Sequence, residues 1–396
     1  MARCSPQLIL DVRRLKPMIG PIAQFIDWSA LQMAYVVAPL RHAPKPKWKL
    51  EEALEFLKGP DFIPAASDSA RIEFDGSWRF KFPTPRPCEF AENNVVHGRL
   101  YRCTEHWQER PVIILLDGKP AIGYHMAFPL FARRFNRAGV NVATLVAPYE
   151  LQRRSRRPIE ENCLEFARAM AQNVAEIRAL TGWLLDEGCP SVALQGFSFG
   201  GWLAGLTACS DARIACAVLT VPGVCMRYYQ PVVWRRVREA LQALRPAHEA
   251  MDTTRLNLTL STPVIPKENI LLIVGIHDLF AEGQPYEELW QKWQQPEIWR
   301  LPHGHVSAQL RLGLMGRVLR WLTPRLDKPF SPDRRMPPNE RTGVDAGWRV
   351  LSAFGPQRPR ATQTGRCFDK SIYEKNYHPF PPRPAYVRGY CSSWVQ

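Results

Sequence analysis

Residues 191–205 read SVALQGFSFGGWLAG, and this stretch guides the interpretation of the whole chain. An apolar run leads into Gly196, Ser198, Gly200 and Gly201, the G-x-S-x-G pattern of a strand that turns sharply into a helix. Glycine suits such a turn because a Cβ would collide with the neighbouring backbone. The pattern predicts that Ser198 is a nucleophile at the start of a helix. The alternative is a glycine turn that serves packing alone.

Strands and helices alternate on both sides of this stretch. Buried strands are expected in the apolar runs 112–118, 141–148, 191–197, 213–224 and 269–278, with a hairpin at 71–85 and a last strand at 297–302. Apolar residues three and four positions apart predict helices over 160–187, 285–293 and 310–322. The alternation predicts an α/β fold with a mostly parallel sheet and helices on both faces. Functional side chains should then follow the carboxyl ends of strands.

A catalytic serine needs a base, and the loop after the last predicted strand offers two histidines in RLPHGHVS (300–307). We favour His305, which follows Gly304 before the closing helix in what we expect to be the more mobile and exposed setting, and keep His303 as the alternative. Asp278 ends the preceding strand in LLIVGIHD (271–278) and could orient the base, although it could also cap a helix. Ser198, Asp278 and His305 thus each follow a strand of their own.

On the motifs GFSFGG, VGIHD and LPHGHVS, residues 71–325 resemble the α/β-hydrolase superfamily of serine hydrolases and, more loosely, its dienelactone-hydrolase-like and ABHD-type (α/β-hydrolase-domain) members. The resemblance implies the α/β-hydrolase fold and a Ser198–His305–Asp278 triad. It implies cleavage of a carboxylic ester through an acyl-enzyme, with no metal or organic cofactor.

The same resemblance implies two backbone amides that stabilise an oxyanion, one from Phe199 and one from Gly118 or Lys119. The chain departs from the family pattern at this loop. It has DGKP (117–120) where many lipases and esterases have HGGG, and Pro120 has no amide hydrogen to donate.

A cluster of arginines follows the strand at 141–148, at the same sheet edge as the triad. Its members are Arg153, Arg154, Arg156 and Arg157. They could bind a carboxylate or phosphate, which would favour an anionic ester or a phospholipid as substrate. The alternative is a solvated run of charge.

Two other functions stay open at this point. A serine peptidase would share the triad, and a non-catalytic hydrolase-fold protein could bind anionic partners through its basic tail. The net charge is +15, but the chain has no nucleic-acid-binding motif, so we expect no nucleic acid as a partner. A small-molecule ester or lipid is the expected substrate, and the oligomeric state is unknown.

The chain divides into an N-terminal helical extension (1–70), a hydrolase domain (71–327) with a lid insertion at about 225–265, and a Pro/Arg-rich tail (328–396) expected to be disordered. Polar residues interrupt the apolar segment 18–40, which favours a helix packed on the domain, with peripheral membrane contact as the alternative. Ten scattered cysteines without a C-x-x-C pair, and no signal peptide, predict a reduced, cytoplasmic protein.

Overall fold

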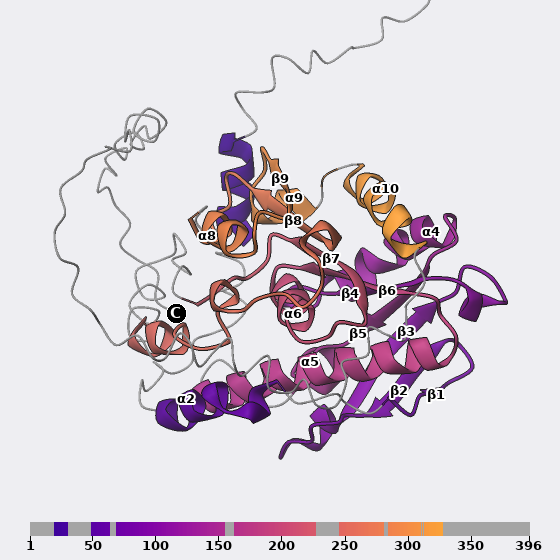
Figure 1. Cartoon of the computed structure of the whole chain (residues 1–396), viewed down its shortest axis with the longest axis horizontal. Helices are drawn as coiled ribbons and strands as arrows, with labels where there is room; N and C mark the ends of the chain where they lie inside the picture. Colours follow the sequence, from indigo (N-terminus) through magenta and orange to yellow (C-terminus); the bar gives the residue numbers. More distant parts are fainter. Residues whose placement is uncertain are drawn as a thin grey trace, which may run out of the picture. The chain divides into compact units, whose positions relative to one another are not determined.

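A computed structural model describes residues 20–30, 49–63, 69–154, 162–226, 245–280, 284–309, 311 and 313–327. Within these ranges, nine strands form one sheet (Figure 1). The strands are β1 (Glu73–Phe74), β2 (Arg79–Pro83), β3 (Val95–Tyr101), β4 (Val112–Leu116), β5 (Asn141–Leu145), β6 (Val192–Phe197), β7 (Ile214–Thr220), β8 (Ile270–Gly275) and β9 (Glu297–Leu301).

The sheet has an antiparallel edge and a parallel body. Its order is β1-β2-β3-β5-β4-β6-β7-β8-β9, and the pairs from β1 to β5 are antiparallel. From β5 to β9 all neighbouring strands run parallel. The prediction of a mostly parallel sheet is confirmed, and the carboxyl ends of β6, β8 and β9 share one edge.

The helices fit the periodicity of the sequence. They are α2 (Leu50–Lys58), α3 (Gly123–Met126), α4 (Phe128–Asn136), α5 (Cys163–Asp186), α6 (Phe199–Ala208), α8 (Gln284–Lys292), α9 (His305–Gln309) and α10 (Leu314–Leu326). Residues 20–30 are also helical. In α5, the predicted positions Met170, Val174 and Ile177 are at most 1% exposed, but every residue from Ala169 to Gly182 is buried, so the middle of this helix is packed on all sides.

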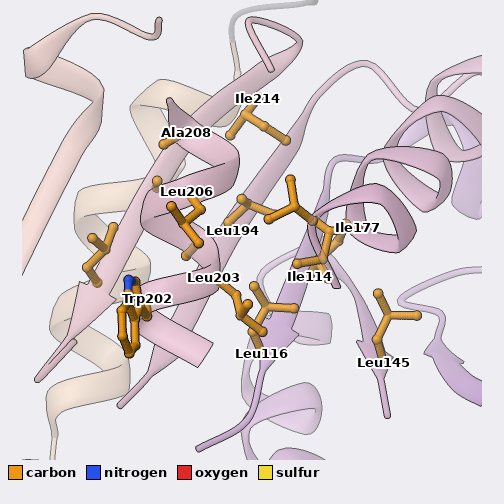
Figure 2. Close-up of a cluster of buried hydrophobic side chains, with 14 of the residues drawn as sticks. Ile114, Leu116, Leu145, Ile177, Leu194, Trp202, Leu203, Leu206, Ala208 and Ile214 are labelled. Carbon is orange, nitrogen blue, oxygen red and sulfur yellow. The ribbon is translucent and has the colours of Figure 1, made fainter. Parts of the chain in front are cut away.

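The sheet separates two apolar cores, because alternate strand residues point to opposite faces. On one face, Ile114 and Leu116 of β4 and Leu194 of β6 pack with residues of α5 and α6 (Figure 2). On the other face, Ile113 and Leu115 pack with residues of α4 and α10. Helices therefore cover both faces, as predicted.

Several predicted segments lie partly or wholly outside the described residues. The tail 328–396 is one of them, and so are residues 227–244 of the predicted lid insertion. The predicted extension 1–70 is described over residues 20–30, 49–63, 69 and 70. There α2 packs on α5, and Leu57 and Phe62 are part of the first core. In the described part of the chain, no helix combines the length and apolar character needed to cross a bilayer.

Candidate active site

Ser198 lies on a strained turn between β6 and α6. Its backbone has φ 52° and ψ −114°, a conformation that residues with a Cβ rarely adopt. The flanking glycines permit this turn, because a Cβ on Gly196 would lie 2.0 Å from the carbonyl oxygen of Gly200. A Cβ on Gly200 would lie 2.2 Å from the carbonyl oxygen of Leu116. The turn thus packs the start of α6 closely against the ends of β6 and β4.

Backbone hydrogen bonds to the end of β7 and to the loop after it hold the backbone of Ser198 in place. The Ser198 N–H donates to the Thr220 carbonyl at 2.9 Å, and the Ser198 carbonyl accepts from the Gly223 N–H at 3.0 Å. The Trp202 N–H also donates to the Ser198 carbonyl, at 3.1 Å, as the first helical bond of α6. The backbone of Ser198, from which the hydroxyl projects, is thus fixed by main-chain hydrogen bonds.

Asp278 and His305 complete a hydrogen-bonded chain with Ser198. His305 Nε2 lies 2.8 Å from Ser198 Oγ, and His305 Nδ1 lies 2.8 Å from Asp278 Oδ2. Asp278 follows β8, and His305 is the first residue of α9 after β9. This arrangement suits a neutral ring whose Nδ1–H donates to the carboxylate and whose Nε2 accepts from the serine hydroxyl.

The structure distinguishes the two histidines of the loop after β9. His305 is buried, not exposed as expected, and bonded to both other residues, whereas the His303 backbone forms short loop bonds to Leu301 and His277. Burial lowers the pKa of His303, and the nearby Arg311 lowers it further. Of the two candidates, His305 is therefore the one in reach of Ser198.

Charges around His305 outweigh the effect of its burial. Burial alone lowers the pKa of this ring, but the negative charge and hydrogen bond of Asp278, with a contribution from Asp27, raise it above its usual value. A raised pKa makes the ring a stronger proton acceptor. Such a base is matched to a reaction near neutral pH.

Two further side chains surround Asp278 and His305, and sequence reasoning did not predict either of them. The Tyr286 hydroxyl of α8 donates to Asp278 Oδ2 at 2.9 Å, and the Phe280 N–H donates to Asp278 Oδ1 at 2.8 Å. The Phe280 ring also stacks on His305, with centroids 4.4 Å apart. Neither residue belongs to a recognisable motif, so these contacts follow only from the fold.

The predicted oxyanion groups fare differently from one another. The Phe199 N–H lies at the start of α6, where amides have no acceptor within the helix. Gly118 lies beside the serine, and a Cβ on it would be 3.5 Å from Ser198 Cβ. However, the Gly118 N–H already donates to Asp117 Oδ1 at 2.8 Å. Phe199 is thus the predicted amide donor with the clearest support. The side chain of Lys119, the third predicted residue, lies near it, with Nζ 5.9 Å from the centroid of the Phe199 ring.

Burial raises the pKa of Asp117 to about 6, although its bonds from the Tyr124 and Gly118 amides act in the opposite direction. The Asp117 carboxyl group therefore binds a proton more readily than a solvated aspartate does.

Arg153 has to be corrected from a substrate ligand to a structural cation. Its side chain is fully buried, and its two terminal nitrogens bind the Glu176 carboxylate at 2.8 and 2.7 Å. A further bond of 2.8 Å reaches the Val146 carbonyl. Arg154 is exposed, while Arg156 and Arg157 lie outside the described residues.

Two surface hollows lie away from these residues. They measure about 550 and 420 Å³. Trp78 and Arg99 of the β1–β3 edge line the first, and Phe80 of β2 and Tyr124 of α3 line the second. Neither hollow is lined by Ser198, His305 or Asp278. In the described ranges, no group of three or more His, Cys, Asp and Glu residues is arranged to hold a metal.

Known proteins share parts of this architecture. A family model described as "Alpha/beta hydrolase domain containing 18" matches residues 90–238, which include β4, β5, β6 and the Ser198 turn. An uncharacterized protein of Mycobacterium tuberculosis strain H37Rv is 26% identical over 264 residues, which are 60% of this chain. The chain spans 60% of the length of that relative.

Solved structures of esterases are similar at a lower level. An acetyl xylan esterase from Paenibacillus sp. R4 is 12% identical, with 72% of this chain and 99% of the esterase covered and a TM-score of 0.46. The Pyrococcus furiosus esterase Pf2001 is 15% identical, with 67% and 99% covered and a TM-score of 0.45. The sheet order and the serine turn are those of the α/β-hydrolase fold, and residues 90–238 match a family model of an α/β-hydrolase domain.

Proposed function

We propose that the protein is a serine hydrolase that cleaves a carboxylic ester through an acyl-enzyme. The observation that carries the proposal is the pair of 2.8 Å hydrogen bonds that joins Ser198, His305 and Asp278. The strained backbone of Ser198 at the start of a helix also supports it, because such a turn exposes a nucleophile beside unpaired amides.

In the first half of the reaction, Ser198 Oγ attacks the ester carbonyl while its proton passes to His305 Nε2. Asp278 stabilises the imidazolium that forms. The Phe199 amide, aided by the N-terminal end of α6, stabilises the negative oxygen. His305 then gives the proton to the departing alcohol, which leaves the acyl group on Ser198.

In the second half, His305 accepts a proton from water, and the resulting hydroxide attacks the acyl carbonyl. The proton returns to Ser198 Oγ as the carboxylic acid leaves. The sum is one ester and one water converted to an acid and an alcohol. The chain's own residues perform each step.

The acyl group remains open within this proposal. With Arg153 buried, Arg154 is the described member of the arginine cluster that could meet an anionic substrate. A series of p-nitrophenyl esters with two, four and eight acyl carbons, together with one ester that carries a carboxylate, would define the preference. A peptidase would instead favour the matching p-nitroanilides.

The first test is labelling with a fluorophosphonate probe, with the modified residue located by mass spectrometry. We expect the label on Ser198, no label in Ser198→Ala, and a labelling rate at least about 10³-fold lower in His305→Ala. His303→Ala is the matched control from the same loop and should keep most of the rate. Absence of label on folded wild-type protein would reject the enzyme and favour a binding protein with this fold.

A further inference from the structure

The helix at residues 20–30 lies against the two loops that carry Asp278 and His305. In Figure 1 this indigo helix runs beside β8, β9 and α9. Its inner side has Gly20, Ala23 and Asp27, all buried. The helix approaches the loop after β8 closely at Gly20, where an added Cβ would lie 3.0 Å from the His277 ring.

Asp27 binds the backbone next to both proposed catalytic side chains. Asp27 Oδ2 accepts from the His305 N–H at 2.6 Å, and Asp27 Oδ1 accepts from the Val306 N–H at 2.9 Å. Asp27 Oδ2 also accepts from the Leu279 N–H, at 3.2 Å. One carboxylate thus connects Leu279, which follows Asp278, to the first two residues of α9, His305 and Val306.

This arrangement explains why a carboxylate is buried here at all. A carboxylate fully removed from water is costly unless several donors bind it, and the first amides of a helix such as α9 have no acceptor of their own. Gly304 makes room, because a Cβ on it would lie 2.5 Å from Asp27 Oδ2. The helix at residues 20–30, the loop after β8 and the loop after β9 therefore accommodate the Asp27 side chain between them.

We propose that Asp27 is a positioning residue that holds the loops of Asp278 and His305 in register, so that the base meets Ser198. The proposal rests on the proposed serine-hydrolase function. Asp27 does not touch the substrate. It acts on the orientation of His305 through the main chain, and its negative charge adds to that of Asp278 at the ring.

The charge of Asp27 provides a readout that a merely structural role would not change. The titratable groups around His305 are Asp278 after β8, Asp27 from the helix at 20–30, Tyr286 from α8, and His277 and His303 in the neighbouring loops. Asp27 contributes to the raised pKa of His305. Removal of this charge should therefore lower the pKa of His305 and move the acidic limb of the reaction to lower pH.

The experiment compares the full-length wild type with Asp27→Asn, Asp27→Ala and the control Glu51→Gln. Glu51 is an exposed carboxylate of α2 and should behave as wild type. The readouts are the labelling rate with the fluorophosphonate probe across pH, kcat and KM for p-nitrophenyl butyrate, and the melting temperature. We expect the maximal labelling rate and kcat to fall by about 10- to 100-fold with little change in KM. The acidic limb should also shift to lower pH.

A titration that needs no reaction separates this proposal from the proposed function. In protein labelled at histidine Cε1 with ¹³C, the His305 signal is assigned by its loss in His305→Gln, and its pKa is compared between wild type and Asp27→Asn. If the wild type proves unreactive, a lower pKa of His305 in the variant still supports the contact with Asp27. Variants that fold and keep the wild-type rate, acidic limb and His305 titration overturn the proposal. Failure of both variants to fold also overturns it, because Asp27 would then serve folding alone.

Discussion

Ser198 and His305 lie 2.8 Å apart, but the structure holds them in different ways. The serine is held by its own neighbours in sequence, Gly196 and Gly200, and by backbone bonds to the next strand. The histidine is held by side chains that come from elsewhere, including Asp27, which lies 278 positions away in the chain. The half of the candidate site around Ser198 is therefore local, while the half around Asp278 and His305 is assembled over long range.

The largest expected effect comes from a substitution in the long-range half of the site, around Asp278 and His305. Asp278→Asn should reduce the acylation rate by about 10⁴-fold, or about 5 kcal/mol, because an amide no longer holds the His305 tautomer that accepts the serine proton. The rate of fluorophosphonate labelling measures this loss. The control is Asp211→Asn, a buried carboxylate bound to Arg213 far from the triad, which should lose stability but keep its rate. Equal rates in both variants would rule out the orienting role of Asp278.

A change in the local half should affect stability instead. Gly200→Ala places a Cβ 2.2 Å from the Leu116 carbonyl oxygen, and the backbone at this point cannot yield easily. We expect a loss of about 3 kcal/mol in the free energy of unfolding, measured by urea denaturation. Gly139→Ala is the contrasting variant, because its φ of 76° strains alanine but nothing lies within 4 Å of the added Cβ, whereas Gly200 has a helical backbone and a clash. Gly139→Ala should lose only about 1 kcal/mol, from backbone strain alone. A Gly200→Ala variant as stable as wild type would show that the clash is relieved at no cost.

The smallest expected effect sharpens the comparison. Tyr286→Phe removes the hydroxyl that donates to Asp278 Oδ2 at 2.9 Å but keeps the ring. One such bond contributes about 1 kcal/mol, so kcat should fall by about 5-fold with KM nearly unchanged. Tyr101→Phe, whose hydroxyl meets Arg99 at the other side of the sheet, serves as the control. An unchanged kcat would mean that Asp278 is held sufficiently without the Tyr286 hydroxyl.

The same division explains what sequence reasoning could reach. Short sequence patterns predict the strands, the long helices and the Ser198 turn, because apolar runs and glycine spacing act on nearby backbone. Strand ends then predicted where Asp278 and His305 would lie. Asp27 could not be found in this way, because it was only a polar interruption of an apolar segment. Its partners are backbone amides, which leave no trace in residue types.

Arg153 shows the opposite error. In sequence it belonged to a cluster of arginines at the functional edge, which suggested an anionic ligand. In the structure the ligand is internal, because Glu176 of α5 turns its carboxylate toward Arg153 and Thr84 also binds that carboxylate. Glu176 sits on the buried side of a long helix, and nothing in the spacing of the two residues, 23 positions apart, connects them. Long-range ion pairs of this kind are set by packing and are not visible in a charge count.

The tie between Asp27 and His305 also bears on the order in which the molecule is completed. As the chain is synthesised from its N-terminus, Asp27 is made before the strands of the sheet. Its three amide partners, Leu279, His305 and Val306, are all present only after the last strand has been made. Contacts between such distant positions form late in folding, because the loop they close is long. The serine turn can form while its base is still absent. Reactivity would then arrive only with the closing contacts, so that a partly made chain carries an inert serine.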